Sequence, residues 1–227
     1  YELKNYKDKD LDFDFEKNLK FLNLGYTYKN NNHEVFKNVN VEFKKNKSVA
    51  IIGKNGSGKS TLLNLLTGLI KPTTGDIFID ETKNLSETNS NWLKKISYVQ
   101  QNIFLLNDSI KNNITFENNN ELNYKNYSYV KEFVDLDEAF SNLSNGLNTI
   151  VGNDGLNLSG GQKQLISIAR ALYKNSDIIV FDEANSALDF YYKDILKKTI
   201  QKLKGTKTII FVTHDLSFLK NSFDEVY

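Results

Sequence analysis

Apolar positions alternate with polar ones near the N-terminus and form short unbroken runs further along the chain. Residues 39–43 alternate strictly, as in a strand with one buried face. A similar stretch precedes the asparagines at 30–32, so we expect antiparallel β structure over Leu19–Phe43 with a turn at these asparagines. A second turn at Pro72–Gly75 should lead into a strand over Asp76–Asp80.

Runs rich in valine and isoleucine predict four buried strands, which are Ser48–Ile52, Ile96–Val99, Ile178–Phe181 and Thr208–Val212. The last two are typical of central strands in a parallel sheet that is covered on both faces. Apolar residues at 165, 168, 169 and 172 have helical spacing. The chain therefore predicts an α/β fold with a mostly parallel central sheet, an antiparallel β subdomain and a helical subdomain over about 102–175.

Composition restricts the classes of function. The net charge of +1 and a single arginine, Arg170, argue against nucleic acid as a partner. There is no cysteine for disulfides or thiolate chemistry, and no apolar run nears the roughly 20 residues that span a bilayer. Because the chain has no methionine, we expect residue 1 to be internal to a longer polypeptide or to have been exposed by processing. The start of the chain is rich in lysine and aspartate, and we expect residues 1–18 to form a linker.

A glycine-rich segment, GKNGSGKST at Gly53–Thr61, lies between a predicted strand and a predicted helix over Thr61–Leu66. This order is typical of a phosphate-binding loop (P-loop), in which backbone N–H groups and the helix dipole bind phosphate. The residues predicted to contact a nucleoside triphosphate are Gly53, Asn55, Gly56, Ser57, Gly58, Lys59, Ser60 and Thr61. Lys59 would reach the β and γ phosphates and the Ser60 hydroxyl would bind Mg²⁺. The alternative is a glycine-rich turn before an ordinary helix.

Two carboxylates follow the apolar run at Ile178–Phe181. Asp182 is predicted to hold Mg²⁺, and Glu183 to orient or deprotonate the attacking water. The alternative is that both acids only solvate the end of a strand.

A second anion-binding helix terminus is predicted at Ser159-Gly160-Gly161. Serine is a good N-cap, and glycines leave backbone N–H groups accessible. The alternative is a simple helix start. A second phosphate site in a chain with one P-loop suggests that the two sites are shared between subunits.

Six short motifs follow one another along the chain. They are the P-loop, Tyr98–Gln101, Leu158–Gln162 (LSGGQ), Ile178–Glu183, Ser186–Asp189 and Thr213–Asp215. This series resembles the nucleotide-binding domain of ATP-binding cassette (ABC) proteins over nearly the whole chain. The resemblance implies the P-loop NTPase cassette fold, the cofactors ATP and Mg²⁺, and a head-to-tail dimer. In such a dimer Ser159 and Gly161 of one copy would cover the γ-phosphate that is held by Lys59 of the other. Gly160 and Gln162 of the same motif would also belong to the nucleotide site.

The resemblance also implies roles for four further residues. His214 would contact the γ-phosphate and hold Glu183 and the attacking water in place. Gln101 would reach Mg²⁺ or the water, and Gln100 is the alternative match for this role. Tyr28 would stack on the adenine ring. Asp189 would belong to the nucleotide site through the Ser186–Asp189 motif.

Two stretches resemble the corresponding segments of exporter-type half-transporters. The first is Phe104–Ile110 together with Asn113-Ile114, and the second is Thr149–Gly152. This implies a transmembrane domain in the same polypeptide, a location at the cytoplasmic face of the cell membrane, and ATP-driven export or flipping of a substrate. The single intact set of motifs favours a homodimer, with a heterodimer as the alternative. Asn185 stands where many relatives carry threonine, and the end at Tyr227 implies C-terminal truncation. The alternatives are a soluble non-transport ABC ATPase and a regulatory ATP-binding cassette.

Overall fold

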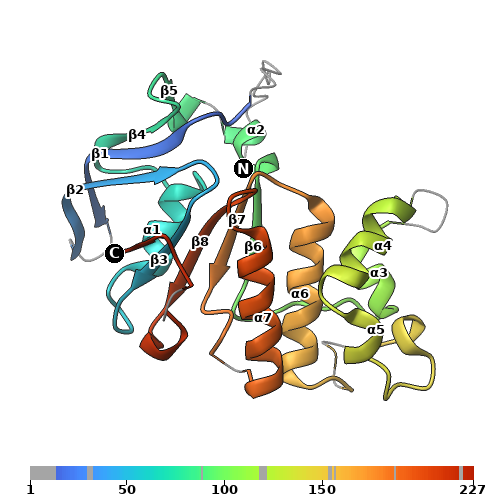
Figure 1. Cartoon of the computed structure of the whole chain (residues 1–227). Helices are drawn as coiled ribbons and strands as arrows, with labels where there is room; N and C mark the ends of the chain where they lie inside the picture. The colour runs from blue at the N-terminus through green and yellow to red at the C-terminus, as the bar shows by residue number, and fades with distance from the viewer. Residues whose placement is uncertain are drawn as a thin grey trace. The chain divides into compact units, whose positions relative to one another are not determined.

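The structure is a computed structural model that describes residues 14–29, 33–87, 89–117, 122–152, 155, 157–186, 188–219 and 222–227. The predicted turn at 30–32, most of the predicted linker and Ala187 of the Ser186–Asp189 motif lie outside these residues. The chain divides into two compact units (Figure 1), the first formed by residues up to 45 and 57–96, the second by 46–56 and 97–227.

The first unit contains a four-stranded antiparallel sheet. Its order is β2 (His33–Lys44), β1 (Asn18–Tyr28), β4 (Thr74–Ile79) and β5 (Lys83–Asn84). The antiparallel structure predicted over Leu19–Phe43 is thus confirmed for its described parts, 19–28 and 33–43. The strand predicted over Asp76–Asp80 instead ends at Ile79, because Asp80 turns the chain with φ 52°. Its carboxylate accepts hydrogen bonds from the backbone N–H groups of residues 16–18 at 2.7–3.1 Å.

Helices α1 (Lys59–Leu66) and α2 (Asn89–Lys94) and the short helix η1 (Leu85–Glu87) complete the first unit. Trp92 on α2 is fully buried. Its indole N–H donates to the Leu66 carbonyl at 2.8 Å, and its ring meets Phe15 edge-on at 5.9 Å. A buried indole needs such a hydrogen-bond acceptor, so Trp92 joins the end of α1 to the apolar core of the unit.

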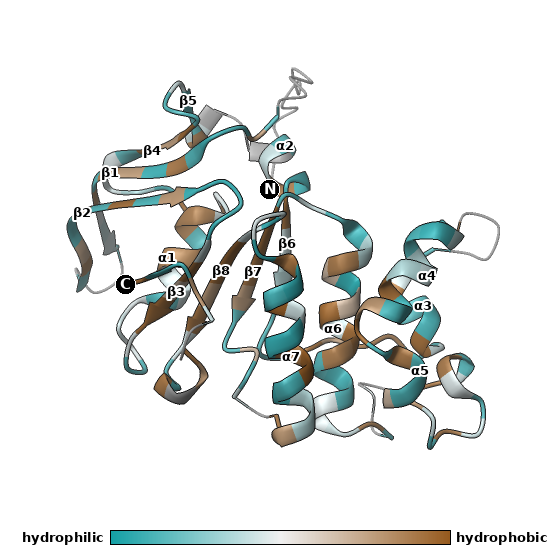
Figure 2. Ribbon diagram, in the orientation of Figure 1, coloured by the Kyte–Doolittle hydropathy of each residue, from teal (hydrophilic) through white to brown (hydrophobic). Residues whose placement is uncertain are grey.

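The second unit is built on a five-stranded sheet. Its order is β6 (Ile96–Val99), β7 (Ile178–Asp182), β8 (Thr208–Thr213), β3 (Ser48–Ile52) and β9 (Glu225–Val226). Strand β8 runs parallel to both β7 and β3, and β3 runs parallel to β9. The apolar colour of β3, β7 and β8 in Figure 2 matches their almost complete burial. The predicted parallel central strands are confirmed.

The helices of the second unit are α3 (Ile110–Thr115), α4 (Tyr124–Phe133), α5 (Leu136–Ala139), α6 (Gly160–Lys174) and α7 (Phe190–Leu203), with short turns η2 (Gly146–Asn148) and η4 (Leu216–Phe218). Helix α6 packs against α3, α4 and α7 (Figure 1) and buries the apolar stripe at 165, 168, 169 and 172. The mostly helical character predicted after residue 102 is confirmed, and α7 is an additional helix.

Strand β9 is fixed to β3 by side chains as well as by the backbone. The Asp224 carboxylate accepts from the Ser48 backbone N–H and hydroxyl, both at 2.8 Å, and lies 3.2 Å from the Lys204 ammonium. Partial burial raises the pKa of Asp224, but these hydrogen bonds outweigh it and hold the pKa below its usual value. Strand β3, which leads to the glycine-rich loop, therefore has a bonded neighbour on each side.

Within the described ranges, none of the helices combines the length and the apolar character that a membrane crossing requires.

Candidate nucleotide and magnesium site

The glycine-rich loop follows β3 directly and ends where α1 begins at Lys59. Gly58 is the N-cap of α1 with φ 92°, and Gly56 has φ 80°. A Cβ atom at Gly58 would lie 2.6 Å from Val35 Cγ1. Gly58 is therefore required both by its left-handed backbone and by the close approach of β2. Lys59 and Ser60 open the helix, where N–H groups without intrahelical partners favour an anion.

Tyr28 and Thr61, both predicted to bind nucleotide, are brought together in the first unit. The Tyr28 hydroxyl and the Thr61 Oγ1 are 2.9 Å apart. Tyr28 is the last residue of β1, its ring meets Tyr26 edge-on, and 41% of its surface is exposed. An exposed ring held at its hydroxyl is suited to stacking with a planar base.

Glu183 and His214 are brought together at the carboxyl ends of β7 and β8. These strands are parallel neighbours with Asp182 opposite Val212, so their ends meet at one edge of the sheet. Glu183 Oε2 lies 2.8 Å from His214 Nδ1, with the carboxylate largely buried and the imidazole half-exposed. This hydrogen bond assigns a proton to Nδ1 of the ring.

Glu183 has an unusual backbone conformation. Its φ of 49° is in the left-handed region, which a glutamate rarely occupies. Its N–H donates to the Val212 carbonyl at 2.9 Å, which continues the β7–β8 pairing by one residue. Strained residues concentrate at functional sites, and here the strain turns the chain immediately after the strand that carries Asp182.

Helix α6 begins at the predicted serine. The Ser159 hydroxyl accepts from the Gln162 N–H at 3.2 Å, and the Gln162 side chain accepts from the Ser159 N–H at 3.0 Å. This capping box leaves Ser159 and Gly160 exposed, while Gln162 is buried and its amide reaches the Ala139 carbonyl. Gln162 thus supports the turn from inside the protein.

The turn is also supported by Tyr192 of α7. A Cβ atom at Gly161 would lie 2.0 Å from Tyr192 Cδ2. Burial raises the pKa of Tyr192, and a hydrogen bond with the Ser159 hydroxyl partly offsets the increase. Tyr192 also donates its backbone N–H to the Asp189 carboxylate, which caps α7, at 3.1 Å. Asp189 and Ser159 are therefore connected through one tyrosine.

This packing predicts the effect of adding a methyl group at Gly161. Gly161→Ala should lower the free energy of unfolding by about 1–3 kcal/mol, because the ring of Tyr192 would have to move from its present packing. The double variant Gly161→Ala/Tyr192→Ala should lose less than the sum of the single losses in urea denaturation. Gly160→Ala, at the exposed neighbouring position, is the control and should be close to neutral. Additive losses would contradict the proposed clash.

Asn185, at the position where threonine was noted in relatives, is buried between the two acidic motifs. Its amide oxygen accepts from Thr213 Oγ1 at 3.0 Å, and its amide nitrogen donates to the Asp215 carboxylate at 3.4 Å. The sequence did not assign it a role. It ties the segment after β7 to the end of β8 and so fixes the two strand ends that carry Glu183 and His214.

The two exporter-like stretches lie side by side in the second unit. Ser109 and Ile150 form an antiparallel bridge, and the Ile110 N–H donates to the Thr149 carbonyl at 3.0 Å. Phe104 and Ile150 are each 63% exposed. Each of the two paired stretches therefore carries an exposed apolar side chain.

The only arginine in the chain holds this region in place. Arg170 of α6 donates to the carbonyls of Phe104 and Asn113 and stacks on the Phe116 ring at 4.6 Å. Burial lowers its pKa to about 10, so the guanidinium stays charged at neutral pH. Because its donors are used within the fold, Arg170 is a structural residue.

Gln101 lies just after β6 at an exposed position, and the adjacent Gln100 carbonyl accepts from the Gln164 amide at the long distance of 3.5 Å.

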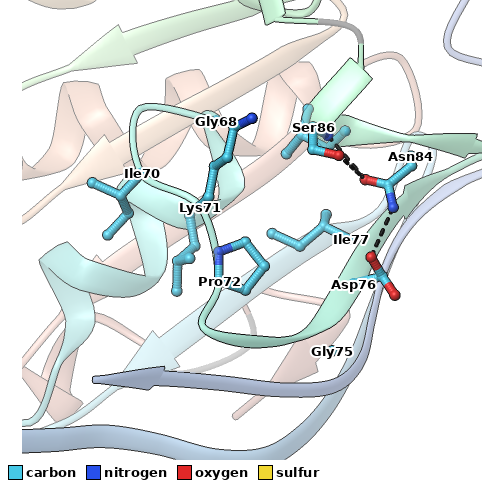
Figure 3. A pocket seen from close by; sticks show the side chains of 11 residues that line it. Gly68, Ile70, Lys71, Pro72, Gly75, Asp76, Ile77, Asn84 and Ser86 are labelled. Atoms are coloured by element: carbon cyan, nitrogen blue, oxygen red, sulfur yellow. Dashed lines mark hydrogen bonds between the residues drawn. The ribbon is translucent and has the colours of Figure 1, made fainter. Parts of the chain in front are cut away.

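A separate cavity of about 160 Å³ lies in the first unit beside the end of α1 (Figure 3). Its rim carries Asn84, whose amide side chain bonds to both Asp76 and Ser86. None of the predicted site residues lines this cavity.

The fold and these motifs define an ABC cassette, and comparison with known proteins agrees. The sequence profile of the family described as ABC transporter matches residues 36–186. This chain therefore belongs to the ABC transporter family.

Named relatives are translocation proteins. The chain is 40% identical over 203 residues to the leukotoxin translocation ATP-binding protein LktB of Mannheimia glucosida, covering 89% of this chain and 28% of that protein. It is 38% identical over 205 residues to LktB of Mannheimia haemolytica, covering 90% and 29%. The chain thus spans less than a third of the length of these curated relatives.

The fold is confirmed by a solved structure of a bacterial Atm1-family ABC exporter with ATP bound. Its TM-score with this chain is 0.83 at 30% sequence identity, over 92% of this chain and 37% of the exporter chain.

Proposed function

We propose that the chain is the domain of a membrane ABC exporter that binds and hydrolyses ATP in a Mg²⁺-dependent reaction. The observation that carries this proposal is the Glu183–His214 pair, held at 2.8 Å at the carboxyl ends of two parallel strands. A carboxylate held by an imidazole is suited to accept a proton from water. The glycine loop and the start of α1 supply the phosphate-binding groups.

Different residues of the chain bind the phosphates, the base and the metal ion. Lys59 and the N–H groups at the start of α1 bind the phosphates, and Tyr28 presents its exposed ring to the base. Ser60 and Asp182 would hold Mg²⁺, which neutralises charge on the phosphoryl oxygens when bound. The donor set fits the ion, because hydroxyl and carboxylate oxygens are the ligands that Mg²⁺ prefers.

Glu183 carries the central step. Its carboxylate orients the attacking water and takes its proton, while His214 holds the carboxylate by donating from Nδ1. The left-handed φ of Glu183 fixes where the side chain leaves the backbone, so little reorganisation is needed when the water attacks. Gln101 is proposed to contact the same water or the metal.

A head-to-tail pair of two copies completes the proposal. The exposed Ser159 and Gly160 would cover the γ-phosphate bound at Lys59 of the second copy, as the anion-binding character of a capped helix start supports. A transmembrane partner in the same polypeptide is supported by the exposed apolar side chains of Phe104 and Ile150. The domain would then act at the cytoplasmic face of the membrane.

The alternatives are less well supported. The relatives are named for translocation and export, which favours a transporter over a soluble non-transport ATPase. A regulatory cassette that binds ATP without cleaving it has no need of a paired glutamate and histidine.

Mixing two inactive variants tests both hydrolysis and the shared site. Lys59→Ala and Ser159→Arg should each release almost no phosphate alone. A 1:1 mixture should recover roughly a quarter of the wild-type rate, since half of randomly formed pairs are mixed and each mixed pair has one complete site. Phosphate release with Mg·ATP, with EDTA as the blank, is the measurement. No recovery in the mixture would contradict the head-to-tail arrangement, whereas an inactive wild type would contradict the enzyme itself.

A further inference from the structure

Tyr98 forms a hydrogen bond with Asp182 that has no part in the function proposed above. It lies on β6, next to β7 in the sheet, and its hydroxyl donates to the Asp182 Oδ2 at 2.8 Å. The side chain of Tyr98 is partly buried. An ordinary phenol is neutral near pH 7. Tyr98 therefore donates a hydrogen bond to this carboxylate without adding a charge of its own.

A neutral donor has a particular consequence for a metal-binding carboxylate. An arginine or lysine at this place would neutralise Asp182 and weaken its attraction for a cation. A phenol leaves the full negative charge in place and fixes only the plane of the carboxylate. Partners of this kind orient metal ligands, and their removal typically weakens metal binding 10- to 100-fold.

We propose that Tyr98 is a positioning residue that orients the Asp182 carboxylate for the magnesium ion of bound Mg·ATP. This inference rests on the proposed function. Two backbone features make the placement specific. Asp182 is the last residue of β7, so strand pairing fixes its Cα, and the strained Glu183 follows it directly. The contact with Tyr98 then limits rotation of the Asp182 side chain, which the backbone alone leaves free.

The chain provides a matched control in Tyr173. Tyr98 and Tyr173 both line a cavity of about 560 Å³ beside α3 and α6. The Tyr173 hydroxyl also bonds to a carboxylate, that of Glu117, and accepts from the Asn123 N–H at 3.0 Å. Glu117 has no proposed part in metal binding. Removing either hydroxyl therefore deletes a similar bond in the same region, but only one deletion affects the proposed metal ligand.

The experiment measures metal and nucleotide binding separately on the full chain. Mn²⁺ is titrated into protein saturated with ADP and followed by electron paramagnetic resonance, and binding of a fluorescent ATP analogue is measured in EDTA. Tyr98→Phe should weaken Mn²⁺ binding about 10-fold or more and leave binding in EDTA unchanged. Tyr173→Phe should match the wild type in both. In an Asp182→Asn background, Tyr98→Phe should have almost no further effect, because the partner it orients is gone.

Other outcomes overturn the inference. Wild-type Mn²⁺ affinity in Tyr98→Phe would show that the hydroxyl does not orient the ligand. Weaker nucleotide binding in EDTA, or a clearly lower melting temperature than that of Tyr173→Phe, would make Tyr98 a structural residue only. These results are distinct from failure of the proposed function, in which the wild type itself neither binds Mn²⁺ with ADP nor hydrolyses ATP.

Discussion

Replacing Glu183 with glutamine is expected to lower the rate of phosphate release at least about 100-fold, the usual contribution of a general base. Glutamine has nearly the same shape as glutamate but accepts a proton poorly, so it cannot take the proton from water. It can still accept a hydrogen bond from His214 Nδ1 through its amide oxygen. ATP binding should therefore be retained, and the ATP-bound pair of copies should accumulate because the nucleotide is no longer consumed.

Steady-state phosphate release and size-exclusion chromatography with ATP measure the two effects. Glu132→Gln removes the same charge from an exposed position on α4 and serves as the control. Its rate should equal that of the wild type. Equal rates in the wild type and Glu183→Gln would refute the assignment of the base.

Lys59→Ala is expected to have the second large effect, an almost complete loss of ATP binding. A charge-assisted hydrogen bond to phosphate contributes up to about 3 kcal/mol, which corresponds to about 100-fold in affinity. The backbone of the loop should be unchanged, because alanine is a good helix former at the first position of α1.

Equilibrium binding of a fluorescent ATP analogue measures this loss. Lys54→Ala provides the control, since Lys54 is an exposed lysine of the same loop to which no phosphate contact is assigned. The control should bind within a few-fold of the wild type. If both variants lost affinity equally, the loss would come from net charge and not from a contact made by Lys59.

The elements that the sequence predicted well are those whose own residues decide their structure. Strands β7 and β8 are β-branched runs buried on both faces, and α6 carries its apolar stripe and its serine cap in its own sequence. The glycine loop is equally local, because Gly56 and Gly58 have backbone angles that few other residues adopt.

Elements fixed by distant partners could not be predicted in this way. Strand β9 has only two residues and exists through its pairing with β3. Helix α2 is short and is held by the burial of Trp92. Helix α7 does carry an apolar stripe of its own, at 195, 196, 200 and 203, so its sequence contains the signal for a helix.

The same distinction applies to the site. The sequence motifs indicated Asp182, Glu183 and His214 separately, and pairing of β7 with β8 brings the last two together. The bond between Tyr98 and Asp182 joins residues 84 positions apart. No spacing rule predicts it, because it depends on the order of β6 and β7 in the sheet.

The pairing of the last strand has a practical consequence for labelling. Ile52, the residue before the glycine loop, donates its N–H to the Tyr227 carbonyl at 2.8 Å. A fluorophore attached to the side chain at position 227 would therefore lie beside the strand that enters the loop, and its emission should respond when nucleotide arrives.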